Sequence, residues 1–151
     1  MPININFIKS KEKEKILEEL NKQFGIKRLD YTLVMSGKEK IRGFSGDLSK
    51  EDILKINELA NIEVIGLYLL KEEHDLRLGF DALHILKDNI SKNILELKEE
   101  QFLQWIRGFD LDLKVPQGTY VIKYKEDLLG CGKSNNEKLF NYVPKDRRIR
   151  K

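Results

Sequence analysis

Apolar residues at helical spacing predict two helices in the first part of the chain. Residues 11–24 place their apolar side chains on one stripe, with Ser10 as the expected N-cap and Gly25 as the expected end. Ser49 and Asp52 have the spacing of a capping box, which predicts a second helix that runs to about residue 60. Because the first helix is amphipathic, we expect it to pack on another element.

Short apolar runs between and after these helices predict strands. Residues 29–35 and 41–44 flank a Ser-Gly pair and are expected to form a β-hairpin. Residues 62–70 are almost continuously apolar, which predicts a central strand that is covered on both faces. The polar residues 73–75 are the expected turn of a second hairpin, whose other strand continues to Phe80.

A polar segment after this hairpin predicts a boundary between two parts of the chain. Asp81 is the expected N-cap of a short helix at residues 82–87. Residues 88–93 follow this helix and are polar and without periodicity. We therefore expect two domains, residues 1–90 and residues 91–151.

The second part is expected to begin with a strand at residues 94–97 and a helix at residues 98–107. Gly108 is well placed to end that helix in the left-handed conformation. Trp105 is expected at the edge of the buried face. The side chains expected in the core are those of Phe102, Leu103 and Ile106.

The rest of the chain alternates between β-like runs and turn residues. Residues 109–115 alternate apolar and polar side chains, which predicts a half-buried strand, and a turn at residues 116–118 follows. Three further β-like runs occupy residues 118–124, 128–133 and 139–143. Helices and short strands in this order indicate an α+β fold.

Positive charge is concentrated at the C-terminal end. From Lys114 onward there are ten Lys and Arg residues against four Asp and Glu, a net charge of +6. The whole chain is +3, so residues 1–113 hold 18 basic and 21 acidic side chains, net −3. Two interpretations are open: a basic face with interleaved Tyr and Phe that binds nucleic acid, or a solvated Lys-rich surface.

Size and composition limit the class of protein. A chain of 151 residues is long enough for one ordinary domain or two small ones. No apolar run approaches the roughly 20 residues that cross a bilayer, so no membrane partner is expected. Residues 1–7 lack the features of a signal peptide, and Cys131, as the single cysteine, fits a reducing compartment. We therefore expect a cytoplasmic protein.

A short glycine motif and the cysteine are the first candidates for chemistry. Gly132-Lys133-Ser134 copies the end of a phosphate-binding loop, but the glycine required five residues earlier is replaced by Asp127. The loop also needs a helix directly after it, and a turn is expected there. Cys131 lies between glycines in an expected strand, which favours a buried packing residue over a nucleophile.

The remaining titratable residues do not form a catalytic pattern. His74 and His84 are ten positions apart and have no cysteine pair, so a zinc site is not expected. Asp110 and Asp112 alternate with apolar residues and are expected on the exposed face of a strand. Other carboxylates alternate with Lys on predicted helices. We therefore expect no catalytic residues, no cofactor and no metal.

Glycine-containing motifs give the second part a recognisable order. Arg107-Gly108 ends a helix between two strands, and the following motifs are Gly118-Thr119-Tyr120-Val121-Ile122 and Leu129-Gly130-Cys131-Gly132-Lys133. This order resembles the PUA domain, the small β-barrel-like RNA-binding module of pseudouridine synthases and archaeosine transglycosylases. Many PUA helices begin with Gly-Ala, whereas this chain has Lys98-Glu99, which argues against a close backbone approach of RNA there.

The resemblance extends to both sides of these motifs. Residues 65–68, 76–78 and 81–86 resemble the pre-PUA domain of small ribosome-biogenesis factors. Residues 141–148 are similar to the end of the PUA-like segment attached to some RNA 5-methylcytosine methyltransferases. The chain contains no methyltransferase cofactor motif, so the resemblance implies an RNA-binding part without that activity.

The resemblance implies an α/β pre-PUA domain at residues 1–90, followed by a PUA-like barrel at residues 91–151. It also implies a non-enzymatic protein that binds RNA, either rRNA or tRNA, and that acts in ribosome biogenesis, rRNA processing or RNA modification. Ribosome-assembly proteins or an RNA-modifying enzyme are the protein partners that it implies.

The expected RNA-binding residues combine cations for phosphate with an aromatic side chain for stacking. Alternatives are open for some: Tyr142 in the core, Arg107 at the helix C-terminus, and Lys123 with Lys125 on one solvated strand face. The full set is Arg107, Gly108, Lys114, Lys123, Lys125, Lys133, Lys138, Tyr142, Lys145, Arg147, Arg148 and Arg150.

Two other classes of function remain open at the level of sequence. The first is a protein–protein adaptor in a ribosome-assembly or RNA-modification complex, which would dock through the acidic N-terminal part. The second is an enzyme whose site is a deep pocket lined by His84, Cys131 and carboxylates.

Overall fold

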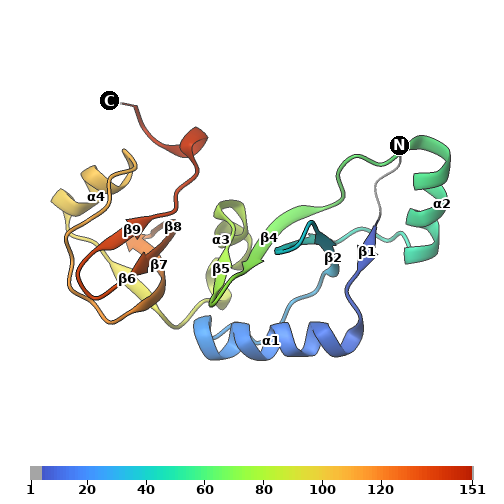
Figure 1. Cartoon of the computed structure of the whole chain (residues 1–151), viewed down its shortest axis with the longest axis horizontal. Coiled ribbons are helices and arrows are strands. Elements are labelled where there is room, and N and C mark those ends of the chain that lie inside the picture. Colours follow the sequence, from blue (N-terminus) through green and yellow to red (C-terminus); the bar gives the residue numbers. More distant parts are fainter. Residues whose placement is uncertain (1–4, 151) are drawn as a thin grey trace.

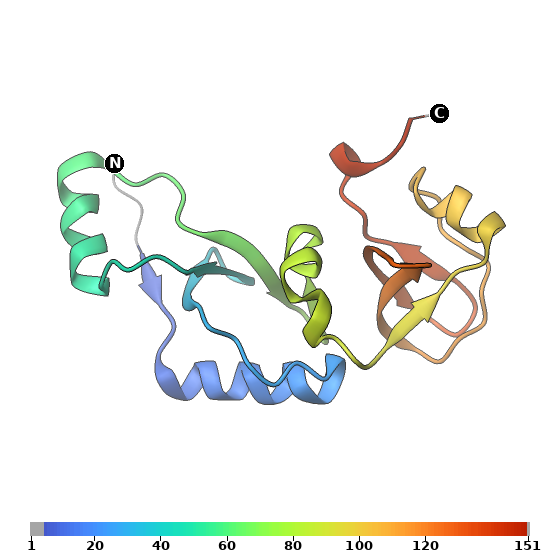
Figure 2. The same ribbon diagram turned by 180° about the vertical axis from the view of Figure 1, so that it is seen from behind.

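The computed structural model describes residues 5–150. Outside the described residues lie residues 1–4 and Lys151. Residues 1–4 belong to the segment in which no signal peptide is expected, and Lys151 belongs to the basic end. The described chain is elongated, with α2 and β1 at one end, the C-terminal sheet at the other and α3 between them (Figures 1 and 2). No helix within residues 5–150 is long and apolar enough to cross a membrane.

The N-terminal part is a five-stranded antiparallel sheet with the strand order β1-β2-β3-β4-β5. Two helices accompany it, α1 at Ser10–Phe24 and α2 at Lys50–Ala60. The strands are β1 at Asn6–Phe7, β2 at Thr32–Ser36, β3 at Lys40–Phe44, β4 at Leu67–Glu72 and β5 at Leu76–Leu78.

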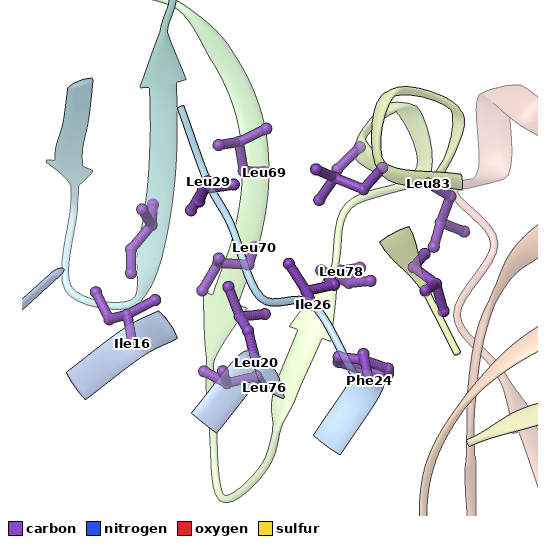
Figure 3. Packing of buried hydrophobic residues seen from close by; sticks show 14 of the residues in the cluster. Ile16, Leu20, Phe24, Ile26, Leu29, Leu69, Leu70, Leu76, Leu78 and Leu83 are labelled. Carbon is purple, nitrogen blue, oxygen red and sulfur yellow. The ribbon is translucent and has the colours of Figure 1, made fainter. Parts of the chain in front are cut away.

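Helix α1 covers one face of this sheet and forms the main core with it (Figure 3). Its apolar stripe is completely or almost completely buried and meets apolar side chains of β3, β4 and β5. The opposite face of the same strands is therefore free to carry polar side chains. The packed residues are Ile16, Leu20 and Phe24 on the helix and Ile41, Leu70, Leu76 and Leu78 on the sheet.

The C-terminal part is a four-stranded sheet with the order β6-β7-β8-β9, in which only β6 and β7 are parallel among the described strands. Within residues 5–150 this sheet is open and does not close into a barrel. Its elements are β6 at Ile94–Glu96, α4 at Glu99–Trp105, β7 at Gly118–Tyr124, β8 at Asp127–Ser134, β9 at Leu139–Asn141 and the 3-10 turn η2 at Lys145–Arg147. Helix α3 at Phe80–Leu86 and the 3-10 turn η1 at Lys87–Asn89 connect the two sheets.

The two sheets share one apolar core. Val121, Leu128 and Cys131 of the C-terminal sheet are buried in the same cluster as the α1 residues. Strand β5, an edge strand of the first sheet, contacts β7 and β8, and the Cys131 thiol donates a hydrogen bond to the Leu78 carbonyl (3.5 Å). Covering an edge strand in this way prevents it from pairing with another chain. The core fixes the two parts against each other.

Several local predictions are confirmed. The hairpin of β2 and β3 forms as expected, and residues 73–75 form the turn between β4 and β5. Ser49 and Asp52 make both hydrogen bonds of the capping box, at 3.1 and 3.3 Å. Gly25 ends α1 in the left-handed conformation, with φ of 77°. The α+β class is also confirmed by two sheets with separate helices.

Two predicted helix caps are wrong by one or two positions. Ser10 is the first residue of α1, and Lys9 is its N-cap. Asp81 lies inside α3, whose N-cap is Gly79. The Asp81 carboxylate does not cap the helix and instead forms an ion pair with Arg147 of the C-terminal segment at 3.0 Å.

The strand predicted at residues 62–70 is wrong in its first half. Strand β4 begins at Leu67, because Gly66 has φ of 67° and interrupts the extended backbone. The carbonyls of Ile65 and Gly66 accept hydrogen bonds from the Arg42 side chain, at 3.0 and 2.8 Å, and not from the backbone of a neighbouring strand. Only the middle of β4 is fully buried, so the strand is not covered on both faces along its length.

The buried face predicted for helix α4 is also wrong. Trp105 is fully buried, Leu103 is 47% exposed, and Phe102 and Ile106 are only partly buried. The large indole fits because Gly132 on β8 has no side chain, and its N–H donates to the Leu129 carbonyl at 2.7 Å. The spacing of apolar residues along the helix does not reveal the space that Gly132 leaves for the Trp105 indole.

Residues 109–115 do not form the predicted strand. Leu111 alone makes a bridge, to Leu139, and Phe109 is 59% exposed. The buried Asn141 side chain donates hydrogen bonds to the carbonyls of Trp105 and Phe109, so the Phe109 carbonyl is bonded to a side chain and not to a neighbouring strand. The Asp110 carboxylate accepts from the Asn141 backbone N–H at 2.8 Å, so this residue is not merely solvated.

We expect Gly108→Ala to lower the free energy of unfolding by about 1 kcal/mol or more, because alanine resists positive φ. Gly108 has φ of 93°, as the helix end predicted from sequence requires. Its missing side chain also leaves room for Arg148, whose Cδ would lie 2.4 Å from an added Cβ. Urea denaturation measures the change, and a neutral substitution would show that the left-handed end is unimportant.

Candidate nucleic-acid interface

Three cationic residues stand side by side across strands β3, β4 and β5. Lys40 is the cross-strand partner of Lys71, and Lys71 is the partner of Arg77. Directly paired residues share one face of a sheet, and this is the face opposite helix α1. Like charges in this arrangement destabilise a sheet. We call these three residues the cation row.

Nearby carboxylates neutralise part of the cation row. Lys71 pairs with Glu73 at 3.1 Å and with Glu39 at 3.4 Å, and Arg77 pairs with Glu73 at 3.5 Å. The hydrogen bond that Lys71 donates to the Glu73 carboxylate, and then the negative charge of that carboxylate, raise the pKa of Lys71. Lys40 has no carboxylate partner among residues 5–150, and its ammonium lies 5.5 Å from the centre of the Tyr68 ring.

An irregularity in the sheet brings an aromatic ring to the same face. The register shifts between Ile41 and Arg42, so that Arg42 is the partner of Tyr68 whereas Lys40 is the partner of Lys71. Tyr68 thus lies on the face of the cation row, although three positions separate it from Lys71. Burial raises the pKa of the Tyr68 hydroxyl, and the charges of Arg77 and Lys71 act in the opposite direction.

The C-terminal part closes this face into a cleft. The Arg77 guanidinium lies 4.4 Å from the centre of the Tyr142 ring. Arg147 pairs with Asp81 on α3 at 3.0 Å and lies 5.5 Å from the centre of the Phe80 ring. The cleft has a volume of about 430 Å³ and is lined by residues of both sheets and of α3. Its lining holds four cations (Lys40, Lys71, Arg77 and Arg147) and two carboxylates (Asp81 and Asp146), net +2.

This composition suits nucleic acid. Cations attract phosphate, and exposed rings or guanidinium planes stack on unpaired bases. Both kinds of group are present in the cleft, from segments far apart in the sequence. Of the residues predicted to bind RNA, Tyr142 and Arg147 lie here. Tyr142 is 38% exposed, which excludes the alternative of a core position.

The basic tail is folded onto the C-terminal sheet. The Arg148 side chain donates to the Val143 carbonyl at 2.9 Å and lies against Gly108. The Ile149 backbone N–H donates to the Ile106 carbonyl at 2.8 Å. Arg148 and Gly108 therefore contribute to structure, whereas Lys145, Arg150 and the nearby Arg107 are exposed.

The other predicted lysines lie outside the cleft lining. Lys123 is on β7, but Lys125 is in the following turn with φ of 53° and lies over the Tyr124 ring, so the two do not share a strand face. Lys133 is on β8 as the partner of Thr119 and Phe140. Lys114 and Lys138 lie in two loops that are joined by a hydrogen bond from the Gln117 backbone N–H to the Asn136 side-chain oxygen (3.0 Å).

The cysteine and the glycine motif considered for chemistry have structural roles. Cys131 is 3% exposed, and burial raises the pKa of its thiol to about 12, so it carries its proton at neutral pH. Gly132, Lys133 and Ser134 belong to strand β8 and do not form a phosphate-binding loop. The part of the chain that the structure describes contains no cluster of His, Cys, Asp and Glu that would hold a metal ion.

Sequence reasoning missed most of the cleft. The cation row and Tyr68 belong to residues 1–113, whose net charge is −3, so the average charge concealed a local basic face. A signal was present in Leu76-Arg77-Leu78, where a cation alternates with buried leucines. The pairing of Lys40 with Lys71 depends on strand register and is not visible in the sequence.

Comparison with known proteins supports the PUA resemblance. Residues 92–149 match the family model described as the PUA domain of the methyltransferase RsmF. Among solved structures, a conserved PUA domain protein from Thermoplasma acidophilum matches with a TM-score of 0.56 and 15% identity, over 91% of this chain and 93% of that one. A search of curated proteins gives no significant match.

Proposed function

We propose that this chain is a non-enzymatic RNA-binding protein acting on rRNA or precursor ribosomes, because residues 92–149 match the model of the RsmF PUA domain and the fold is similar to that of a PUA domain protein. PUA domains generally bind RNA. The single observation that carries the proposal is the cation row beside Tyr68 and Tyr142 in the cleft. A polyanionic ligand suits these cations, because nearby carboxylates neutralise only part of their charge.

The proposal gives each part of the chain a role. Residues 1–90 are a pre-PUA domain that supplies the cation row, and residues 91–151 are a PUA domain that supplies the stacking ring of Tyr142. The partner is rRNA or tRNA, and the protein acts in the cytoplasm, in ribosome biogenesis, rRNA processing or RNA modification.

Binding in this cleft is expected to be strongly electrostatic. Lys40 is the cation of the row without a carboxylate partner among the described residues, so it is the most available for phosphate. Arg77 has one carboxylate partner, Glu73 at 3.5 Å, and its guanidinium lies over the Tyr142 ring. Lys71, held by two carboxylates, is less available. RNA phosphate is expected to replace Glu73 at Arg77.

Ultraviolet crosslinking in cells, followed by sequencing of the bound RNA, tests the proposed function. We expect the full chain to recover rRNA or its precursors well above their level in a control without crosslinking. An enrichment of tRNA would keep the RNA-binding role and change its target. Recovery of no RNA above the control would contradict the proposal.

A protein–protein adaptor is the second candidate, and one observation favours it. Apolar side chains are exposed on and beside α2, at the far end from the PUA domain: Leu54 is 43%, Leu59 is 87% and Val64 is 68% exposed. Such side chains suit a protein partner. If partners recovered with the full chain stay bound after ribonuclease treatment, while no RNA crosslinks, the adaptor role replaces the RNA-binding role.

A further inference from the structure

Two exposed aromatic rings continue the cleft along the edge of the C-terminal sheet. Phe140 on β9 is 37% exposed, and Tyr142, two residues later, is 38% exposed. The ladder with β8 extends to Tyr142, whose backbone N–H donates to the Cys131 carbonyl at 3.2 Å. Alternate residues of an extended chain point to the same side. Phe140 and Tyr142 therefore share one face. Leu139, which precedes them, and Asn141, which lies between them, are buried.

Each ring has a cation next to it. Lys133 on β8 is the direct cross-strand partner of Phe140, so both side chains lie on one face. Arg77 lies over the Tyr142 ring at 4.4 Å. Beyond Arg77 the cation row continues with Lys71 and Lys40. Ring and cation thus occur twice in succession along this edge.

We propose that this edge binds single-stranded RNA, with two successive unpaired bases stacked on Phe140 and Tyr142 and the phosphates held by Lys133 and Arg77. The inference rests on the proposed function, since it takes RNA as the ligand and adds the class of RNA and the residues that select it. Base–aromatic stacking accepts any base, because every base has a flat face. The preference is therefore for unpaired RNA and not for one sequence.

The spacing of the rings requires unpaired bases. Alternate residues of a strand are about 6.6 Å apart. Successive bases of one strand in a DNA duplex are about 3.4 Å apart along the axis. Bases on the two rings must therefore be separated from each other, which a duplex does not permit. In a duplex the base faces are also covered by neighbouring bases, so these rings have nothing to stack on.

The size of the cleft agrees with this class of ligand. Its volume of about 430 Å³ lies in the range of pockets that hold small molecules. A single nucleotide is a ligand of that size, whereas a duplex is recognised across a much wider surface. Tyr142 joins the cleft to the edge of the sheet, because its side chain lines the cleft and its backbone bonds to β8 at that edge.

Equilibrium binding of the full chain to a short unstructured RNA, and to the same RNA annealed to its complement, tests the inference. We expect the single strand to bind more tightly than the duplex at equal salt. Phe140→Leu and Tyr142→Leu should each weaken single-strand binding by roughly 5- to 150-fold, the loss that follows removal of one stacked base. Phe140→Tyr and Tyr142→Phe should retain affinity, because the ring is kept.

Phe109→Leu is the matched control, since Phe109 is 59% exposed and lies outside the cleft and β9. Its affinity should equal that of the unchanged protein, and urea denaturation verifies that the leucine variants are folded. Equal affinity for both RNA forms, or leucine variants that bind as tightly as the unchanged protein, would overturn the inference and leave the proposed function standing. If neither RNA form binds, the proposed function itself is wrong.

Discussion

Replacing Trp105 by alanine is expected to lower the free energy of unfolding by about 3–5 kcal/mol, the range for removing a large buried aromatic side chain. Trp105 is completely buried and is the largest side chain in the core of the C-terminal sheet. The substitution also leaves the Leu129 carbonyl without its 2.7 Å hydrogen bond. Urea denaturation followed by circular dichroism measures the loss.

Leu103→Ala on the same helix is the control. Leu103 is 47% exposed, so its substitution should change the free energy of unfolding by no more than about 0.5 kcal/mol. The pair separates the observed packing of α4 from the face that helical spacing predicts. A larger loss for Leu103→Ala than for Trp105→Ala would show that the helix packs by the other face.

Reversing two charges of the cation row should have the largest effect on RNA binding. In the double variant Lys40→Glu, Arg77→Glu, attraction to two phosphates becomes repulsion, and we expect the affinity for single-stranded RNA to fall on the order of 100-fold or more at low salt. Arg77→Glu also removes the cation from the face of Tyr142. Fluorescence anisotropy with a labelled RNA measures the change.

Lys15→Glu, Lys22→Glu on helix α1 is the matched control, with the same change in net charge. Both residues are exposed and lie on the helix that covers the other face of the sheet. Their reversal should reduce affinity far less, because only long-range and screened attraction is lost. Equal losses in the two double variants would mean that net charge alone governs binding.

Local features of this fold could be predicted where the chemistry lies within a few residues. Gly25 and Gly108 end helices because positive φ suits glycine, and the capping box needs only Ser49 and Asp52. Trp105 could not be assigned to the core in this way. Its place depends on Gly132, a residue far along the chain on another element.

The charges of the candidate site also depend on residues that are far apart in the sequence. The sequence places the basic excess after Lys114, yet Arg148 of that segment lies against Gly108 and Arg147 pairs with Asp81. The cation row arises from two strand registers and lies within residues 1–113, which have a net negative charge. Average charge therefore indicates that a basic region exists, whereas strand pairing decides which cations are brought together.

The salt dependence of RNA binding tests most directly whether the cation row is the RNA-binding surface. Filter binding over a salt series compares the unchanged protein with Lys40→Ala, Arg77→Ala and with Lys114→Ala, Lys138→Ala, which removes two cations of the loops outside the cleft. At about 0.7 per phosphate contact, the slope of log K against log salt should fall in magnitude by roughly 1.4 for the first pair. The second pair should leave the slope unchanged. A reduced slope for the loop pair, with the slope of the cation-row pair unchanged, would contradict the account.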